Sequence, residues 1–185
     1  MTTPWRGEPD GFAYGEYFYR EYVNWKATGY RLPTNAEWQK AAQGGNGRHK
    51  YPTGDTISYE VANYVSGYYP HPGPANPVYA VGGFPYTSPV GSFLSNGYGL
   101  YDMAGNVAEW CWDLATPRPW NYDLADNIYD PHGPISLDTE DGSVVVHGGS
   151  WDDYQNCCET SICQCYDPGS RVDHVGFRCV LPVQQ

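Results

Sequence analysis

The segment Asn96–Trp110 reads NGYGLYDMAGNVAEW, and it is the most specific pattern in the chain. Three shorter blocks accompany it along the sequence: YRLPTNAEW at Tyr30–Trp38, GGSW at Gly148–Trp151 and VGFR at Val175–Arg178. Each block carries a large aromatic residue, and we expect these side chains to anchor a loop-rich fold: Trp38, Trp110, Trp151 and Phe177. Trp151 and Phe177, together with Cys158, are expected to point into the core.

Composition limits the class of protein. The 185 residues include Lys+Arg 10 and Asp+Glu 21, which gives a net charge of −11. Because nucleic-acid partners select clustered Lys and Arg, this balance excludes a protein that binds mainly phosphate backbones. Gly 22 and Pro 16 together predict many turns and irregular loops, so neither a helical bundle nor disorder fits. No apolar run reaches the length of a membrane span, and no signal peptide is visible, which predicts a soluble chain.

Two helices are expected. Aromatic side chains recur every three or four residues from Tyr14 to Trp25, as in an amphipathic helix. Thr34 and Glu37 have the spacing of a capping box, so a second helix is expected from Asn35 to about Gln43, ending at Gly44-Gly45.

Helical periodicity disappears between Asn46 and about Leu100, where Pro, Gly, Asn, Ser and Tyr predominate. Short strands are expected near Val78–Val81 and at Ser143–His147, where polar and apolar residues alternate or valines cluster. Without an internal repeat or a composition boundary, residues 1–185 are interpreted as one α+β domain.

In order and spacing, the four blocks resemble the formylglycine-generating-enzyme (sulfatase-modifying factor) family, from about Tyr30 to Val180. The resemblance implies a C-type-lectin-like fold of that family's subtype, loop-rich, with two helices and short antiparallel strands. The family usually has a longer N-terminal portion with additional strands, whereas only Met1–Gly29 precede the first block here.

The same resemblance implies a test for enzyme activity. The family's oxidase binds copper through two cysteine thiolates that follow the GGSW block, a ligand pair suited to Cu(I). Matched residue by residue, the second thiolate falls on Cys158 but the first falls on Asp153, which is a hard ligand. Cys157 or Cys163 could supply a thiolate by rearrangement, so a copper-dependent oxidase acting on a sulfatase-type cysteine peptide is the alternative function. A hydrolase triad is not expected, because the histidines have no Ser or Cys partner at recognisable spacing.

The tail resembles more closely the variable region of a diversity-generating retroelement, in which the adenines of Asn codons are mutated at selected positions. A fixed frame would alternate with varied positions between about 151 and 179. Every residue type at the varied positions can be reached from an Asn codon, whereas Lys, Glu, Gln, Met and Trp cannot and are absent there. These positions are the predicted ligand-binding residues: Asp152, Asp153, Tyr154, Asn156, Cys157, Ile162, Cys163, Cys165, Tyr166, Ser170, Val172, Asp173 and His174.

Cysteine crowding near the C-terminus has two readings. Disulfides or a structural zinc ion would need suitable spacing, and neither the vicinal Cys157-Cys158 pair nor Cys163-Gln164-Cys165 has it. Under the retroelement hypothesis these cysteines are products of codon mutation and need no shared bridge or metal.

A calcium ion is the one candidate metal besides copper. In the family pattern, Asp102 and Glu109 can offer carboxylates, and Gly105 and Val107 carbonyl oxygens, which form the all-oxygen set that Ca²⁺ prefers. Asp102 could equally cap the following turn, and Glu109 could pair with a basic residue.

The sequence therefore predicts a non-enzymatic, receptor-type variable protein that requires no cofactor and displays a hypervariable surface. Its partner is expected to be a protein or other macromolecule, with no nucleic acid and no membrane insertion. Ligand identity, compartment and oligomeric state stay open.

Overall fold

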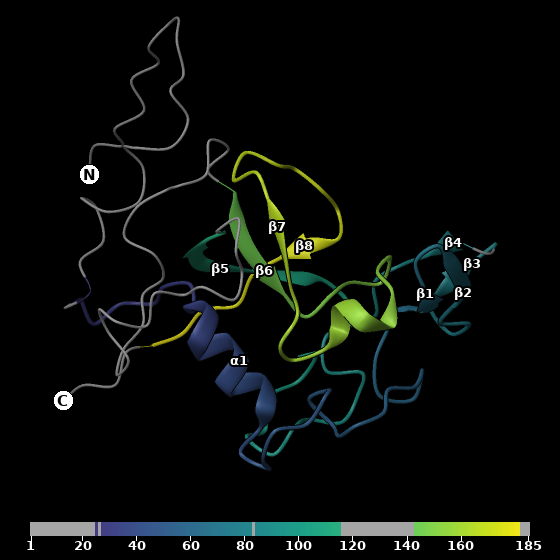
Figure 1. Ribbon diagram of the computed structural model, residues 1–185, viewed down its shortest axis with the longest axis horizontal. Helices are drawn as coiled ribbons and strands as arrows, with labels where there is room; N and C mark the ends of the chain where they lie inside the picture. Colours follow the sequence, from purple (N-terminus) through teal and green to yellow (C-terminus); the bar gives the residue numbers. More distant parts are fainter. Residues whose placement is uncertain (1–24, 26, 83, 116–142, 182–185) are drawn as a thin grey trace, which may run out of the picture.

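A computed structural model of the chain describes residues 25, 27–82, 84–115 and 143–181 (Figure 1). The described elements are α1 (Asn35–Gln43), β1 (Val65–Tyr68), β2 (His71–Ala75), β3 (Ala80–Val81), β4 (Phe84–Pro85), β5 (Ala108–Leu114), β6 (Val144–His147), the 3-10 helix η1 (Gln155–Cys158), β7 (Cys163–Tyr166) and β8 (Val175–Gly176). The described residues thus contain one α-helix. The other predicted helix, from Tyr14 to Trp25, lies outside them except for Trp25.

Helix α1 begins and ends where its sequence predicts. The Glu37 amide donates to the Thr34 hydroxyl at 3.2 Å, and the Thr34 amide donates to the Glu37 carboxylate at 2.8 Å, which completes the capping box. Arg31 adds a paired contact to the same carboxylate, at 2.6 and 2.7 Å. Gly44 ends the helix in the left-handed conformation, with φ 62°, which glycine adopts without strain.

A four-stranded sheet forms the centre, in the order β7-β6-β5-β8. β6 pairs antiparallel with both β5 and β7, and β5 pairs parallel with β8. All four residues of β6 are buried, which agrees with its central place and its run of valines. The predicted strand at Ser143–His147 is therefore confirmed as β6.

Helix α1 lies against one face of this sheet. The Trp38 ring, 1% exposed, stacks on the His147 ring with centroids 4.6 Å apart, and its indole N–H donates to Glu109 at 2.7 Å. Around Trp38 lies a buried cluster that includes Met103, Cys111 and Val145. The α1 face of the sheet is thus the main hydrophobic core of the described residues.

Backbone hydrogen bonds join the sequence blocks. The Gly105 amide donates to the Gly148 carbonyl at 2.8 Å, and the Trp151 amide donates to the Asn106 carbonyl at 2.9 Å. Gly105 has φ 71°, and a Cβ there would lie 2.2 Å from the Asn63 carbonyl oxygen. Only glycine permits this close approach of two segments of the backbone.

Phe177 corrects one expectation, because its side chain is 68% exposed instead of inward-pointing. β8 is a two-residue edge strand, and Arg178, the next residue after Phe177, turns inward to Glu109 at 2.5 and 2.6 Å. Since neighbouring residues of extended chain point to opposite sides, an inward Arg178 puts Phe177 outside. Cys158 is buried as expected, and Trp151 is half-buried.

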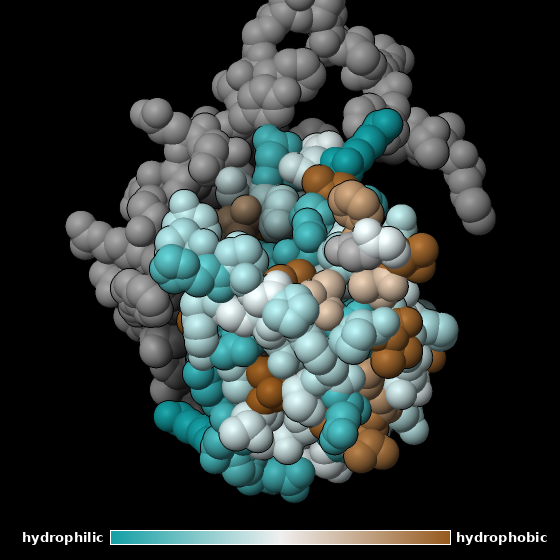
Figure 2. All heavy atoms as spheres, turned by 90° about the vertical axis from the view of Figure 1, so that its right-hand side faces the viewer, coloured by the Kyte–Doolittle hydropathy of each residue, from teal (hydrophilic) through white to brown (hydrophobic). Residues whose placement is uncertain are grey.

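Two antiparallel hairpins, β1-β2 and β3-β4, lie at the side of the molecule that η1 occupies (Figure 1). Val65 of β1 forms a bridge with Tyr154, and the Tyr86 ring stacks with Trp151 at 6.5 Å. Figure 2 looks onto this side and shows a mostly hydrophilic surface, with hydrophobic side chains gathered toward one edge. The β3-β4 region there exposes Val81 and Phe84. None of the described helices has the length and apolar character that a membrane crossing requires.

Candidate functional site

The predicted variable segment runs from the end of β6 through η1 and β7 to β8, in the yellow-green to yellow part of Figure 1. It enters through Gly149, which has φ 64° and where a Cβ would lie 3.0 Å from the Cys158 sulfur. The glycine therefore lets the segment turn back tightly over its own buried cysteine.

None of the thirteen predicted ligand-binding residues is buried. Asp152, Cys165, Val172 and Asp173 are exposed. Half-buried side chains make up the rest: Asp153, Tyr154, Asn156, Cys157, Ile162, Cys163, Tyr166, Ser170 and His174. Of the residues in the proposed frame, Ser150 and Cys158 are buried, each 0% exposed, whereas Pro168, Arg171 and Phe177 are exposed. Burial therefore separates the frame from the varied positions only in part.

Strand β7 divides the varied residues between two faces of the sheet. Cys163 pairs with His147 and Cys165 pairs with Val145, so both cysteines project from the face that α1 covers. Cys163 packs against the core cluster there. Tyr166 projects from the opposite face, because side chains alternate along a strand. The expectation that all thirteen positions share one face is wrong for Cys163 and Cys165.

On the outer face, Tyr166 joins β5 to the residues before β8. Its ring meets Trp110 edge-on at 6.2 Å and His174 at 5.8 Å. Its hydroxyl donates to His174 Nε2 at 3.1 Å, and His174 Nδ1 donates to Asp173 at 3.3 Å. Tyr166 is therefore held by ring contacts and by a short chain of hydrogen bonds that ends at an exposed carboxylate.

The electrostatic surroundings of Tyr166 are negative. Burial raises the pKa of Tyr166, and the Asp153, Cys157 and Asp152 side chains raise it further. The phenol therefore stays neutral and keeps its proton for donation near neutral pH. This ring and its neighbours can bind a ligand through stacking and hydrogen bonds, but they do not form an activated nucleophile.

Asp153, the position matched to a copper ligand, is fully occupied by hydrogen bonds. The Ser150 hydroxyl donates to one carboxylate oxygen at 2.6 Å, and the Gln164 side-chain amide donates to the other at 2.7 Å. The Val65 amide donates to the Asp153 carbonyl at 2.9 Å, which ties hairpin β1-β2 to this place. Asp153 thus fastens the start of the segment to β7 and to β1.

The thiols near Asp153 do not fit a two-thiolate copper site. Cys158 is completely buried, and burial followed by the nearby Asp153 carboxylate holds its pKa well above the usual value. The same two causes raise the pKa of Cys157 to about 11. Cys163 packs against the core cluster around Trp38, whereas Cys158 belongs to a separate buried cluster with Tyr51 and Tyr64. No cluster of three or more His, Cys, Asp or Glu side chains suited to a metal occurs among the described residues.

Glu109, the predicted calcium ligand, is bound by Arg178 and Trp38 through its carboxylate oxygens. This is the alternative that its sequence left open. Asp102 accepts from the Gly91 amide at 2.6 Å through one oxygen, while its other oxygen is buried without a described partner. A calcium ion stays a prediction, and at Glu109 it would have to displace Arg178.

Sequence reasoning missed Gln164 and the β1-β2 hairpin as parts of this region. Gln164 holds Asp153, and the period of two in Cys163–Tyr166 could have placed it on the same face as Tyr166. Tyr68 and Tyr69, 50% and 82% exposed at the tip of β1-β2, belong to the hairpin that contacts η1. That contact joins residues about 90 positions apart in the sequence, and no local signal indicates it.

Comparisons with known proteins agree on the family. Residues 11–183 match the family model described as the sulfatase-modifying factor enzyme 1-like domain. The formylglycine-generating enzyme of Thermomonospora curvata is 36% identical over 166 residues, which cover 85% of this chain and 50% of that protein. The Mus musculus formylglycine-generating enzyme is 32% identical over 164 residues, covering 85% of this chain and 40% of that protein. The chain thus spans half or less of these relatives.

Among solved structures, Treponema denticola variable protein 1 superposes with a TM-score of 0.60 at 31% identity. The match covers 85% of this chain and 49% of that one. A structure described as CarF gives a TM-score of 0.59 at 31% identity, covering 87% of this chain and 50% of that one. The architecture is therefore shared by proteins with different names.

Proposed function

Because the chain belongs to the sulfatase-modifying factor enzyme 1-like family, we propose that it uses that family's C-type-lectin-like fold as a non-enzymatic binding module. Residues 1–185 form a single domain in this proposal, and a retroelement diversifies the region of about 151–179. The varied side chains bind a protein or other macromolecular ligand. No cofactor is required.

The burial pattern carries the proposal. None of the thirteen residues that can be reached from an Asn codon is fully buried, although Cys163 packs against the core cluster, whereas Cys158 of the frame between them is fully buried. A scaffold whose stability rests on Trp38, Val145 and Cys158 can accept many surface sequences, because exposed substitutions usually change stability by about 0.5 kcal/mol or less. The likeness to Treponema denticola variable protein 1 supports the same interpretation.

A copper-dependent formylglycine-generating oxidase is the second candidate, because several of the curated relatives are named formylglycine-generating enzyme. The contacts of Asp153 speak against it, since both carboxylate oxygens accept hydrogen bonds where the oxidase would need a thiolate. Only Cys158 matches a copper ligand, and one buried thiol does not make a two-thiolate site.

Genomic context tests the proposal directly. We expect a near-identical copy of the tail's coding sequence close by, with adenines at the positions that differ, and a reverse-transcriptase gene beside it. A tail without any such copy, in a locus that encodes a sulfatase, would contradict the retroelement hypothesis.

An activity assay separates the two candidates. The purified chain, supplied with copper and air, should leave a sulfatase-type cysteine peptide unmodified in a mass-spectrometric assay. The variant Asp153→Cys should bind Cu(I) more tightly than the parent, because it offers two soft ligands. Formylglycine produced by the parent chain would establish the oxidase and overturn the binding proposal.

A further inference from the structure

Six residues lie on the side of the sheet opposite α1 and are here called the acidic–aromatic face: Trp110, Asp152, Tyr154, Tyr166, Asp173 and His174. We infer that this face binds a protein segment through an arginine side chain. The inference rests on the proposed binding function and adds the chemistry of the partner.

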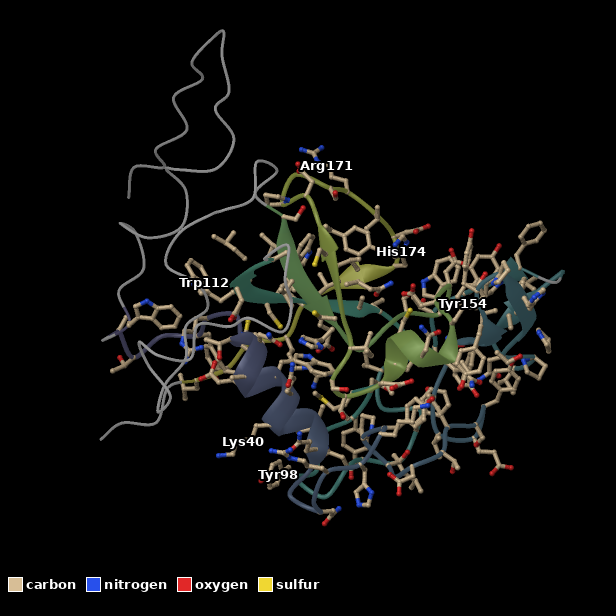
Figure 3. The ribbon with its side chains drawn as sticks, viewed as in Figure 1. Lys40, Tyr98, Trp112, Tyr154, Arg171 and His174 are labelled. Carbon is tan, nitrogen blue, oxygen red and sulfur yellow. The ribbon has the colours of Figure 1, made fainter. Side chains whose placement is uncertain are left out.

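Aromatic rings are the first part of the evidence. Trp110 and Tyr166 meet edge-on at 6.2 Å, and both are only half-buried, although α1 covers the opposite face of the same sheet. In Figure 3, Tyr154 and His174 lie at neighbouring edges of η1 and β8 on the side away from α1. Half-exposed rings on the sheet face opposite α1 favour a flat or cationic partner group, which can stack on them.

A hollow beside Trp110 gives the second part. It has a volume of about 220 Å³ and is lined by Leu32, Trp110, Cys111, Trp112, Val144 and Pro168. Its lining is mainly apolar, which suits the aliphatic stem of a long side chain whose charged end stays at the surface.

Charge is the third part. Between residues 151 and 178, five acidic residues face two arginines. Glu159 is neutralised by Lys50 at 3.1 Å, and Arg178 by Glu109 at 2.5 Å. Four aspartates therefore stand against Arg171 alone, and Figure 3 shows Arg171 at the far end of the β7–β8 loop, away from Tyr154.

Two of these carboxylates are available to a partner. Asp152 and Asp173 are exposed, whereas both oxygens of Asp153 are occupied by Ser150 and Gln164. The net charge of −11 adds attraction at longer range, which speeds the association of a basic partner. Charge complementarity therefore favours a basic partner at this face.

Arginine fits better than lysine because its guanidinium is planar. It can stack on an aromatic ring while its N–H groups donate to a carboxylate, whereas an ammonium group is more strongly hydrated and makes no planar stack. A segment that presents arginine next to small or apolar residues would satisfy the rings, the hollow and the carboxylates together.

A library of random dodecapeptides displayed on phage tests the partner's chemistry. The library is selected against the full chain, and the isolated peptides are measured by calorimetry at low and high NaCl. Peptides are then compared on two charge-matched double variants, Asp152→Asn with Asp173→Asn on the face and Asp55→Asn with Glu60→Gln away from it. Tyr166→Ala reports the contribution of the ring.

We expect peptides enriched in arginine, whose binding weakens about tenfold on the face variant and changes less than about twofold on the control, and weakens with added salt. Replacing arginine by lysine in the best peptide should also weaken binding. Peptides that depend on the face but are neutral or acidic would overturn this inference while leaving the proposed function intact. If no selected peptide responds to Tyr166→Ala or to the face variant, both the inference and the proposed function are contradicted.

Discussion

Asp153 shows how the identity of one residue determines what a position in the fold can bind. Its carboxylate accepts from Ser150 and Gln164, so a position matched to a metal ligand has become a hydrogen-bonded fastener. The sequence predicted the loss of the thiolate, because the match at Asp153 is local. It could not predict Gln164, which reaches Asp153 only once β7 is paired.

The first prediction concerns this fastener. Asp153→Ala should lower the free energy of unfolding by about 1–3 kcal/mol, because it leaves a buried hydroxyl and an amide without their acceptor. Asp153→Asn, which retains one acceptor oxygen, should lose less. Urea unfolding measures both. Asp152→Ala, one residue earlier and exposed, serves as the control and should change stability by no more than about 0.5 kcal/mol. Equal effects at the two positions would mean that the fastener contributes nothing.

Strand β7 shows what a short element adds to a correct sequence pattern. Asn-codon reachability predicted positions of which none is fully buried, but the strand's alternation sends Cys163 and Cys165 to the α1 face and Tyr166 to the outer face. Helix α1 is the opposite case, because Thr34, Glu37 and Gly44 are close in sequence and predicted both ends. Phe177 was predicted wrongly because its direction depends on a two-residue pairing with β5, which the sequence does not reveal.

The second prediction follows from this alternation. Cys165→Ser and Cys157→Ser should each change the free energy of unfolding by about 0.5 kcal/mol or less. Cys163→Ser should cost more, on the order of 1–3 kcal/mol, because it puts a hydroxyl against the core cluster. Neither Cys157 nor Cys163 is in a disulfide in the structure. Loss of folding in the Cys157 and Cys165 variants would point to a disulfide or a metal instead.

The third prediction concerns the start of α1. Thr34→Ala should cost about 1 kcal/mol, because it removes the acceptor for the Glu37 amide, whereas Thr34→Ser keeps that acceptor. The difference between the two variants in thermal or urea unfolding measures the cap. Identical stabilities would show that the capping box is not needed to begin this helix.

At the scale of the whole molecule, two buried groups contribute to the pH dependence of stability with opposite signs. Burial raises the pKa of Asp113 to about 6, despite the Asn35 amide that donates to it at 2.6 Å. Burial also lowers the pKa of His147 to about 4, although its Nδ1 hydrogen-bonds the Ile162 carbonyl. Between pH 4 and 6 the folded state holds more protons on Asp113 and fewer on His147 than the unfolded state. The two contributions therefore oppose one another there.

The fourth prediction uses this opposition. Asp113 stabilises the fold most at low pH and loses that contribution as the pH rises from about 4 to about 6, whereas the contribution of His147 increases over the same range. Asp113→Asn removes the contribution to stability that falls as the pH rises and leaves that of His147, which increases. Its urea midpoint should therefore climb more steeply between pH 4 and 6 than that of the parent chain. Parallel curves for the two proteins would rule out the raised pKa of Asp113.

The backbone bond pair between Arg31 and Val180, at 3.1 and 2.8 Å, brings the first and last described parts of the domain together. In Figure 1 the purple segment that leads into α1 and the yellow segment that ends the described chain lie on the side of α1 away from η1 and the hairpins. Because residues 31 and 180 lie side by side, the segment between them could be inserted into a loop of a host protein, or circularly permuted, without stretching its sheet. In such a fusion, residues 31 and 180 would lie next to the host protein, and the segment between β6 and β8 would face away from it.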